Sequence, residues 1–377
     1  MIRVCFIANG YPFREESEYS FVKNLIDEIA NNDVECTIIS PQSISHKLLN
    51  KCKLRPKFWS YKNKKGNTIK VYQPYYISFS NLKIKGNSVS NILFMKAAKK
   101  VYKMLKSQDI IYGHFWQCGI IGTYLADNRV PVVVATGESK IDVRSIFDKQ
   151  IIENALKKIK GVICVSTKNK EESINLDLIK NHMKVEIFPN GINPDKFYLI
   201  DKNKARERLG FNTNSTIGVY VGAFTHRKGI QRVEKAINDI QNLKMIYIGK
   251  GPCHPKNYLF CGSLENEKIV YYLNAADFFI LPTLAEGCCN AIIEAMACGL
   301  PIISSDLNFN YDILNKESSI LVNPNNIKEI NEAVQKIITN NELSERLHMS
   351  SLKKSKELTI GERAKKIVLL FDKILKC

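Results

Sequence analysis

The sequence predicts an α/β protein of two domains, in which short buried parallel strands alternate with helices. Its 377 residues exceed the size at which one core keeps growing, and 45% of them are apolar, enough for two cores. Strand and helix patterns alternate twice, once in each half. Between the halves, residues 189–197 combine Pro with Asn-Gly and Asn-Pro, which mark a boundary. We therefore expect one domain at 1–190 and a second at 191–360.

The first domain opens with an apolar strand at 2–8, a loop at 9–18, a helix from about 19 to 31 and a strand at 34–40. In open α/β sheets, ligands bind at loops that follow the carboxyl ends of strands. Arg14 lies in such a loop. It can recognise an acceptor phosphate, and a plain surface arginine is an equally good interpretation.

A basic segment follows at residues 36–108, which contain no Asp or Glu although the whole chain has a net charge of +18. Aromatic residues lie between the basic ones, as suits the surface of an anionic membrane. Nucleic acid and a simple solvated face are the alternatives. The basic residues are Lys47, Lys51, Lys53, Arg55, Lys57, Lys62, Lys64, Lys65, Lys70, Lys83, Lys85, Lys96, Lys99, Lys100, Lys103 and Lys106.

The rest of the first domain continues the alternation. Helices are expected at 89–105 and 147–158 and near Glu171, and strands at 110–112, 130–135, 161–165 and 185–188. Two polar segments follow strand ends: Gly113-His114-Phe115-Trp116 and Thr136-Gly137-Glu138-Ser139. We expect both near the ligand-binding edge of the sheet.

The second domain restarts the pattern. Strands are expected at 216–221, 245–248, 278–281 and 302–304, with a helix at 266–275, a turn at 260–264 and a basic helix at 363–376. A glycine-bounded loop, Gly222 to Gly229, carries Arg227 and Lys228 before a helix. Such a loop can neutralise a departing diphosphate. Residues 249–252 read Gly-Lys-Gly-Pro, an incomplete dinucleotide-binding pattern.

Residues 285–301 carry two glutamates, which we expect in different secondary structures. Glu286 lies on the loop after the strand at 278–281, whereas Glu294 lies one turn inside a helix that we expect Asn290 to cap. Free amides at the helix start attract an anion, and the carboxylates can accept hydrogen bonds from hydroxyl groups. A ligand with both features is a nucleotide or a nucleotide sugar.

This stretch, with its E-G opening and its E-A-M-A-C-G-L-P close, resembles the E-x7-E signature of retaining glycosyltransferases of family 4, or glycosyl transferases group 1. The resemblance implies the GT-B fold: two Rossmann-like domains facing each other across a cleft, with the last helix, 361–377, returning to the N-terminal domain. Residues 113–116, 189–197 and 249–252 also resemble family segments.

The resemblance also implies roles for residues of the second domain. It assigns Glu286 to the sugar hydroxyls, Glu294 to the ribose hydroxyls and Lys228 to the donor diphosphate. Arg227 is a candidate replacement for the family arginine, whose place Ala223 occupies. The remaining donor contacts would come from Gly287, Cys288, Cys289, Asn290, Gly222, Ser263 and Leu264.

The acceptor side departs from the family pattern. Of a usual Gly-Gly pair only Gly10 remains, followed by Arg14, and His114 lies in the H-F segment. Thr136 stands where many relatives have a histidine that positions the transferred sugar. We expect that role to fall to the Thr136 hydroxyl or the Gly137 amide.

Together these residues predict a retaining transfer of a hexose from a UDP- or GDP-linked sugar to a saccharide acceptor, lipid-linked and destined for a bacterial surface polysaccharide. No Asp-x-Asp occurs, so we expect no metal and no other cofactor. A nucleotide-sugar epimerase or a sugar phosphorylase of the same fold is the alternative. A non-enzymatic nucleic-acid-binding protein explains the charge but not the glutamates, so no nucleic acid partner is expected.

Composition also indicates a compartment. The longest apolar runs are too short to cross a bilayer, and no secretory signal follows Met1. The eleven cysteines lack C-x-x-C spacing, which is typical of reduced packing residues. We therefore expect a cytoplasmic protein that is peripheral on the inner face of the cell membrane.

Overall fold

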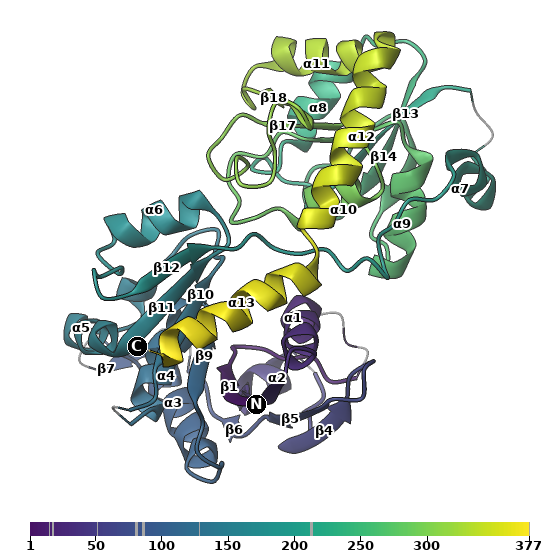
Figure 1. The fold of residues 1–377 in the computed structure, drawn as a ribbon. Coiled ribbons are helices and arrows are strands. Elements are labelled where there is room, and N and C mark those ends of the chain that lie inside the picture. Colours follow the sequence, from purple (N-terminus) through teal and green to yellow (C-terminus); the bar gives the residue numbers. More distant parts are fainter. Residues whose placement is uncertain are drawn as a thin grey trace. The chain divides into compact units, whose positions relative to one another are not determined.

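The computed structural model describes residues 1–14, 16, 19–50, 52–79, 82–84, 87–127, 129–211 and 214–376 (Figure 1). Lys51 and Lys85 of the basic segment lie outside these described residues. The chain forms two compact units. Unit 1 comprises Met1–Val165, Asn169–Phe188 and Arg363–Cys377, and unit 2 comprises Ser166–Lys168 and Pro189–Glu362.

Unit 1 is built on a sheet of eight strands in the order β12-β11-β10-β9-β1-β2-β5-β4. All neighbours run parallel except β4 and β5, which are antiparallel. Strands at each expected place are confirmed. The strands are β1 Ile2–Ile7, β2 Val34–Ile39, β4 Phe58–Lys62, β5 Thr68–Tyr72, β9 Ile110–His114, β10 Val132–Thr136, β11 Ile159–Cys164 and β12 Lys184–Ile187.

The sequence interpretation missed β4 and β5. The inner strands of unit 1 are almost wholly buried and form continuous apolar runs, as parallel strands do. In contrast, β4 alternates exposed and half-buried residues at the sheet edge, and Lys70 interrupts the apolar residues of β5. Their side chains resemble those of a solvated basic stretch, so only strand pairing reveals them.

Helices cover both faces of the unit 1 sheet. They are α1 Ser20–Ala30, α2 Ile44–Leu49, α3 Val89–Tyr102, α4 Trp116–Leu125, α5 Lys149–Lys158 and α6 Thr167–Asn175, with a short η1 at Val143–Ser145. Four two-residue strands complete the unit: β3 Gln42–Ser43, β6 Tyr75–Tyr76, β7 Lys83–Ile84 and β8 Asn87–Ser88.

The last helix, α13 (Ile360–Leu375), packs on unit 1, as the family resemblance implied. The Phe371 ring is fully buried and meets the Tyr112 ring edge-on, with centroids 6.1 Å apart. Gly161 of β11 leaves room for Ile374, because a Cβ at Gly161 would come within 2.6 Å of the Ile374 side chain. The helix is therefore part of the unit 1 core.

Unit 2 has a parallel sheet of six strands in the order β15-β14-β13-β16-β17-β18. Three expected elements, β13, α9 and β16, have the expected bounds. The strands are β13 Thr216–Val221, β14 Leu243–Ile248, β15 Tyr258–Gly262, β16 Phe278–Leu281, β17 Ile302–Ser305 and β18 Ser319–Val322. The helices are α7 Lys202–Leu209, α8 Ile230–Ile237, α9 Asn266–Ala275, α10 Asn290–Ala297, α11 Ile327–Thr339 and α12 Asn341–Glu357.

The expected turn at 260–264 was partly wrong, since Phe260 to Gly262 end strand β15. The chain passes from β14 to β15 through residues 249–257 without a helix, although the two strands are parallel. Such connections usually contain a helix and a dozen or more residues. The short crossover is why the strand was hard to see in the sequence.

The turn-rich stretch at 189–197 begins the long segment of unit 2. Ile192 forms a parallel bridge with Thr359, just before the chain returns to unit 1 through α13. Gly191 permits this approach, because a Cβ there would lie 2.5 Å from the Ile360 backbone nitrogen. The start and the end of the long segment of unit 2 therefore lie side by side. None of the described helices combines the length and apolar character that a membrane span needs.

Candidate active site

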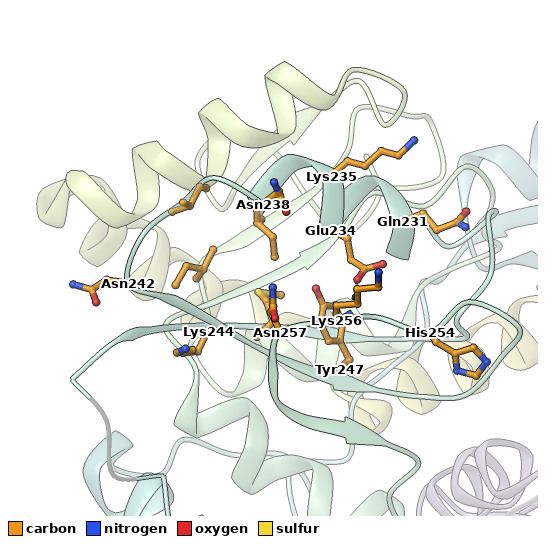
Figure 2. Close-up of a pocket in the computed structure, with 14 residues that line it drawn as sticks. Gln231, Glu234, Lys235, Asn238, Asn242, Lys244, Tyr247, His254, Lys256 and Asn257 are labelled. Atoms are coloured by element: carbon orange, nitrogen blue, oxygen red, sulfur yellow. Dashed lines mark hydrogen bonds between the residues drawn. The ribbon is translucent and has the colours of Figure 1, made fainter.

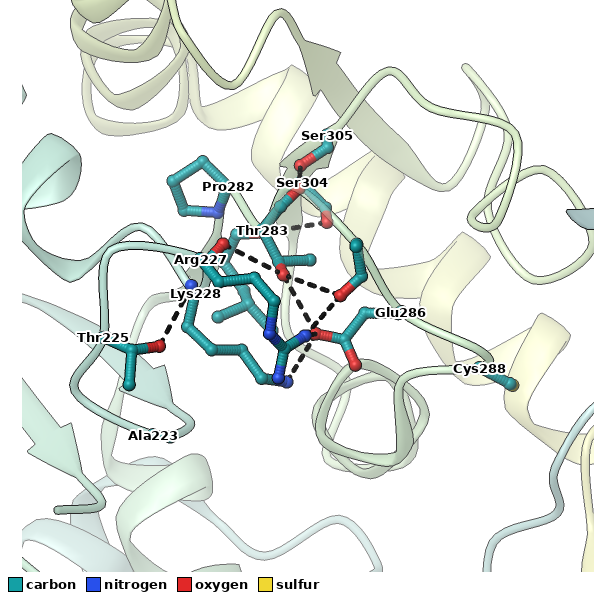
Figure 3. Close-up of polar contacts among 12 residues, drawn as sticks. Ala223, Thr225, Arg227, Lys228, Pro282, Thr283, Glu286, Cys288, Ser304 and Ser305 are labelled. Carbon is teal, nitrogen blue, oxygen red and sulfur yellow. Dashed lines mark hydrogen bonds and ion pairs between the residues drawn. The ribbon is translucent and has the colours of Figure 1, made fainter. Parts of the chain in front are cut away.

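A buried carboxylate, Glu286, is the centre of the polar cluster in unit 2 (Figure 3). It follows β16 and is 9% exposed. Its Oε1 accepts from the Thr283 hydroxyl at 2.9 Å and lies 2.6 Å from Lys228 Nζ and 3.2 Å from Arg227 Nη1. Within the described residues, Oε2 has no partner. One oxygen is thus fully engaged, and the other is open to a ligand.

The loop that carries Lys228 is fixed against the β16 side by a second arginine. The Arg232 guanidinium donates to the His226 carbonyl at 2.8 Å and to the Pro282 carbonyl at 2.8 Å. Gly229 has a φ of +85°, and a Cβ there would lie 2.4 Å from the Pro282 oxygen. Only glycine fits this close approach, which brings Lys228 to Glu286.

Glycines also end three neighbouring strands of unit 2. The Gly222 amide donates to the Ile248 carbonyl at 2.9 Å. Gly249 lies so close that a Cβ would come within 2.0 Å of the Gly222 oxygen. Ser263 Oγ donates to the Gly249 carbonyl at 3.4 Å, and Leu264 packs on the core. The expected donor residues Gly222, Ser263 and Leu264 are therefore neighbours at one edge of the sheet.

Helix α10 begins differently from the expectation. The prediction that Asn290 caps it was wrong: Cys289 is the N-cap residue and makes no side-chain cap. Asn290 Oδ1 instead accepts from Asn190 Nδ2 at 2.9 Å, and the Asn190 amide donates to Cys288 Sγ at 3.4 Å. Asn190, near the start of the long segment of unit 2, thus holds the Asn290 side chain away from the helix start. No local sequence pattern could show this contact.

The helix start offers free donors. Among the residues described, the Gly287 and Cys289 amides find no hydrogen-bond acceptor. Burial raises the pKa of the Cys289 thiol to about 11, so this side chain stays uncharged. The positive end of the α10 dipole is thus available to an anion.

Glu294 is the second glutamate of the motif, and it lies inside α10 as expected. Burial raises the pKa of its carboxyl to about 7, even though the residue keeps some exposed surface. In the part of the chain that the structure describes, no side chain or amide pairs with this carboxylate. Glu294 therefore differs from Glu286, whose charge is balanced by two cations.

In unit 1, the segment after β10 is organised by a residue without an assigned role, Glu138. Its Oε2 accepts from the Thr136 hydroxyl at 2.6 Å and from the Gly137 amide at 2.8 Å, and its Oε1 accepts from the Trp116 amide at 2.9 Å. Burial raises the pKa of Glu138, and these hydrogen bonds act in the opposite direction. The two donors expected to position the sugar thus already serve a carboxylate.

His114 lies at the end of β9 in an aromatic enclosure. It is 9% exposed, and the rings of Phe21, Tyr112 and Phe115 lie within 6.5 Å of its ring. Among the described residues, neither ring nitrogen of His114 finds a hydrogen-bond partner. Burial, with a contribution from Arg363, lowers the pKa of His114 to about 3. The imidazole is therefore neutral at physiological pH.

The loop after β1 packs against the missed strand β4. The Tyr11 and Tyr61 hydroxyls are 2.6 Å apart, and a Cβ on Gly10 would clash with the Tyr19 ring at 2.2 Å. Arg14 is exposed, with its guanidinium 5.1 Å from the centre of the Phe13 ring. Gly10 thus lies in a loop that Tyr11 anchors to β4, whereas the Arg14 side chain is exposed.

A cavity of about 800 Å³ lies elsewhere in unit 2, beside α8 and β14 (Figure 2). The Glu234 carboxylate at its wall accepts from the Lys256 amide at 2.6 Å. The short β14 to β15 crossover leaves this space uncovered. None of the expected site residues lines it. In the described ranges, no three His, Cys, Asp or Glu side chains gather as a metal-binding group.

The fold and the site together define the class of protein. Sucrose-phosphate synthase from Thermosynechococcus elongatus superposes with a TM-score of 0.78 at 17% identity, over the full length of both chains. HepE from Anabaena, solved with UDP and glucose, superposes with a TM-score of 0.70 at 14% identity over 99% of this chain and 100% of its own. The chain therefore has the GT-B fold.

Sequence comparison gives the family. Residues 201–353 match the model of glycosyl transferases group 1. TuaC of Bacillus subtilis, a putative teichuronic acid biosynthesis glycosyltransferase, is 26% identical over 88% of each chain. An Escherichia coli galactosyltransferase is 29% identical over 66% of this chain and 72% of its own. Residues 201–353 are thus similar to the group 1 glycosyltransferases, and these curated relatives are themselves glycosyltransferases.

Proposed function

We propose that this glycosyltransferase moves a hexose, with retention, from a UDP- or GDP-linked sugar to a lipid-linked saccharide of a bacterial surface polysaccharide. The observation that carries the proposal is the Glu286 cluster. One carboxylate oxygen is held by Lys228, Arg227 and Thr283, while the other is open to a sugar hydroxyl. This arrangement positions a sugar beside two cations.

The cations meet the charge of the departing diphosphate. In the unliganded chain Lys228 and Arg227 pair with Glu286, and a bound diphosphate competes for both. The free amides of Gly287 and Cys289 add the positive end of α10. These groups carry the charge without a metal ion. Glu294, which lacks a protein partner among the described residues, accepts from the ribose hydroxyls.

The acceptor is proposed from the relatives' names and from the surface of unit 1. The E. coli relative is named as a galactosyltransferase that uses UDP-Gal and a GlcNAc-diphosphoundecaprenol, and CapM of Staphylococcus aureus as a capsular polysaccharide enzyme. Large apolar side chains are exposed among the lysines of the basic segment: Leu48, Leu49, Phe58, Ile77, Phe79 and Ile84. Each base near an anionic membrane contributes about 1 kcal/mol. We place the enzyme on the cytoplasmic face of the membrane.

The test separates the two glutamates. Glu294→Ala should weaken nucleotide binding by about 10- to 100-fold, the loss of one or two hydrogen bonds to a charged acceptor. Glu286→Ala should leave nucleotide binding intact and lower kcat by about 100-fold or more. Thermal shift against UDP, GDP, ADP and their sugars measures the first effect, and product formation measures the second.

Glu332→Ala on α11, an exposed glutamate outside the motif, is the matched control and should change neither quantity. Wild-type activity in both site variants would overturn the assignments. Products formed without an acceptor would instead support an epimerase, and the anomeric configuration of the product decides retention.

A further inference from the structure

Unit 1 contains a small apolar cavity outside the residues discussed so far. It has a volume of about 180 Å³ and lies between α3, α4 and the start of α5. Apolar side chains form most of its wall: Ile92, Met95, Tyr124, Ile146, Phe147 and Ile151. An engineered apolar cavity of about 150 Å³ takes up benzene. This cavity is therefore large enough for one branched five-carbon unit.

Hydrogen bonds hold the cavity open at its rim. The Ser88 amide donates to the Ile146 carbonyl at 3.3 Å, and the Asp148 amide donates to Asn87 Oδ1 at 2.9 Å. These bonds tie β8 to the turn before α5, so the two walls are fixed relative to each other. The space is thus framed by the fold.

A chain of polar contacts connects this rim to the loop after β1. Asn91 at the rim accepts from Gln117 Nε2 at 2.6 Å, and Gln117 Oε1 accepts from Asn9 Nδ2 at 2.9 Å. Asn9 lies two residues after the end of β1 and precedes Gly10. Two hydrogen bonds therefore link the rim of the cavity to the expected acceptor loop.

The charge around the cavity is positive. Lys96 lines it, and Lys99 Nζ lies 4.2 Å from the centre of the Tyr124 ring. No acidic side chain is among its lining residues. Next to it, the β7–β8 hairpin exposes Ile84, and Leu82 just before the hairpin is exposed as well. The apolar wall and the basic rim together suit a ligand with an apolar chain and an anionic head group.

We propose that this cavity is the subsite for the lipid part of the acceptor and takes an isoprenoid unit next to the phosphate head. The inference rests on the proposed function, because it assumes a lipid-linked acceptor. An isoprenoid carries a methyl branch on every fourth carbon of its main chain, so each unit is bulkier than the same length of a linear acyl chain and fills more of the cavity volume. Lys96 and Lys99 would face the phosphates at the rim.

The probe is farnesyl diphosphate, titrated calorimetrically into the full chain. Farnesyl diphosphate should bind saturably. Inorganic diphosphate should bind at least about tenfold more weakly, since each buried methylene contributes about 0.8 kcal/mol. The linear dodecyl phosphate should also bind at least about tenfold more weakly. Filling the cavity by Ile151→Trp should weaken farnesyl diphosphate binding about tenfold. Ile174→Trp, at an exposed position on α6, is the matched control and should bind as the wild type does.

A second variant keeps the test decisive if Ile151→Trp does not fold. Lys96→Glu changes only an exposed rim residue and should weaken binding several-fold, whereas Lys100→Glu, one turn further along α3, should not. Equal binding in the Ile151→Trp or Lys96→Glu variant would overturn the proposal. Dodecyl phosphate binding as tightly as farnesyl diphosphate would overturn the isoprenoid assignment.

The outcome is distinguishable from a failure of the proposed function. If the cavity assignment is wrong but the enzyme is a sugar transferase, nucleotide sugars still raise Tm, and Ile151→Trp transfers to a lipid-linked acceptor with an unchanged KM. If the cavity assignment is right, that variant raises the KM for the lipid-linked acceptor but not for the nucleotide sugar. A wild-type chain that binds no nucleotide sugar would refute the proposed function itself.

Discussion

Glu286 and Glu294 belong to one short motif, yet their environments give them opposite electrostatic properties. Two cations and a hydroxyl group contact one carboxylate oxygen of Glu286. Glu294 has no such partner among the described residues, and burial raises its pKa to about 7. A ligand with hydrogen-bond donors would supply the partners that Glu294 lacks among these residues.

This difference predicts a pH dependence of nucleotide binding. In the proposed function, ribose hydroxyls donate hydrogen bonds to the ionised form of Glu294, which prevails only above a pH of about 7. Affinity should therefore fall as pH drops below 7, by up to about tenfold per unit. Calorimetric titration of the nucleotide between pH 5.5 and 8.5 measures the slope. Glu294→Gln, which cannot titrate, should flatten it, and an unchanged slope in that variant would assign the dependence to another group.

Glu138 is predicted to be a structural carboxylate of unit 1. Glu138→Gln replaces an acceptor by an amide donor opposite two backbone amides and a hydroxyl, so at least one N–H loses its partner. The unfolding free energy should fall by about 2 kcal/mol. Urea denaturation measures the change, with Thr136→Val, which removes one donor only, as a milder comparison. Unchanged stability would mean that water replaces these contacts.

At the scale of elements, the loop from Gly222 to Gly229 determines where the cations point. It is fixed by Arg232 and by the contact between Gly229 and Pro282, and these hold Lys228 near Glu286. The helix α8 that follows begins at Ile230, with Gly229 as its N-cap. Loop, helix start and strand end thus act as one rigid element.

Gly229→Ala should break this element. The new Cβ would meet the Pro282 oxygen at 2.4 Å and would also hold alanine at a φ of +85°. Gly210→Ala is the matched control, because Gly210 has a φ of +67° but open space around it. The control should lose about 1–2 kcal/mol of stability through backbone strain alone, and Gly229→Ala should lose more and also bind diphosphate less well. Equal losses in the two variants would show that the loop yields easily.

At the scale of the whole molecule, the chain enters the long segment of unit 2 at Pro189 and leaves it at Glu362. The bridge between Ile192 and Thr359 joins the start and the end of this segment. The last segment then completes the core of unit 1 through α13. Unit 1 therefore depends on residues that are synthesised after all of unit 2.

Phe371→Ala tests this dependence. Removing a fully buried ring should destabilise unit 1 by about 3–5 kcal/mol. Leu369→Ala on the same helix, where the leucine is 60% exposed, should change stability by less than about 0.5 kcal/mol. Urea denaturation followed by tryptophan fluorescence reports on unit 1, since Trp59 and Trp116 both lie there. A small effect of Phe371→Ala would mean that α13 is only loosely packed.

The sequence by itself determined the elements whose signals are local. Continuous apolar runs predicted the inner strands, because a strand buried on both faces needs apolar side chains at successive positions. The motif spacing placed Glu286 on a loop and Glu294 in a helix, since both positions depend only on neighbouring residues. The E-x7-E resemblance predicted the family that the comparisons support.

Only the tertiary structure decided the features that join distant parts of the chain. It paired β4 with β5, took the Asn290 side chain away from the helix start, and committed the Thr136 hydroxyl to Glu138. It also paired Lys228 with Glu286 and left Glu294 unsatisfied within the described residues. Burial and hydrogen-bond partners depend on residues far away in sequence, whereas periodicity reports only local geometry. The sequence therefore predicted the residues of a candidate site, and the fold decided the burial and the hydrogen-bond partners of each.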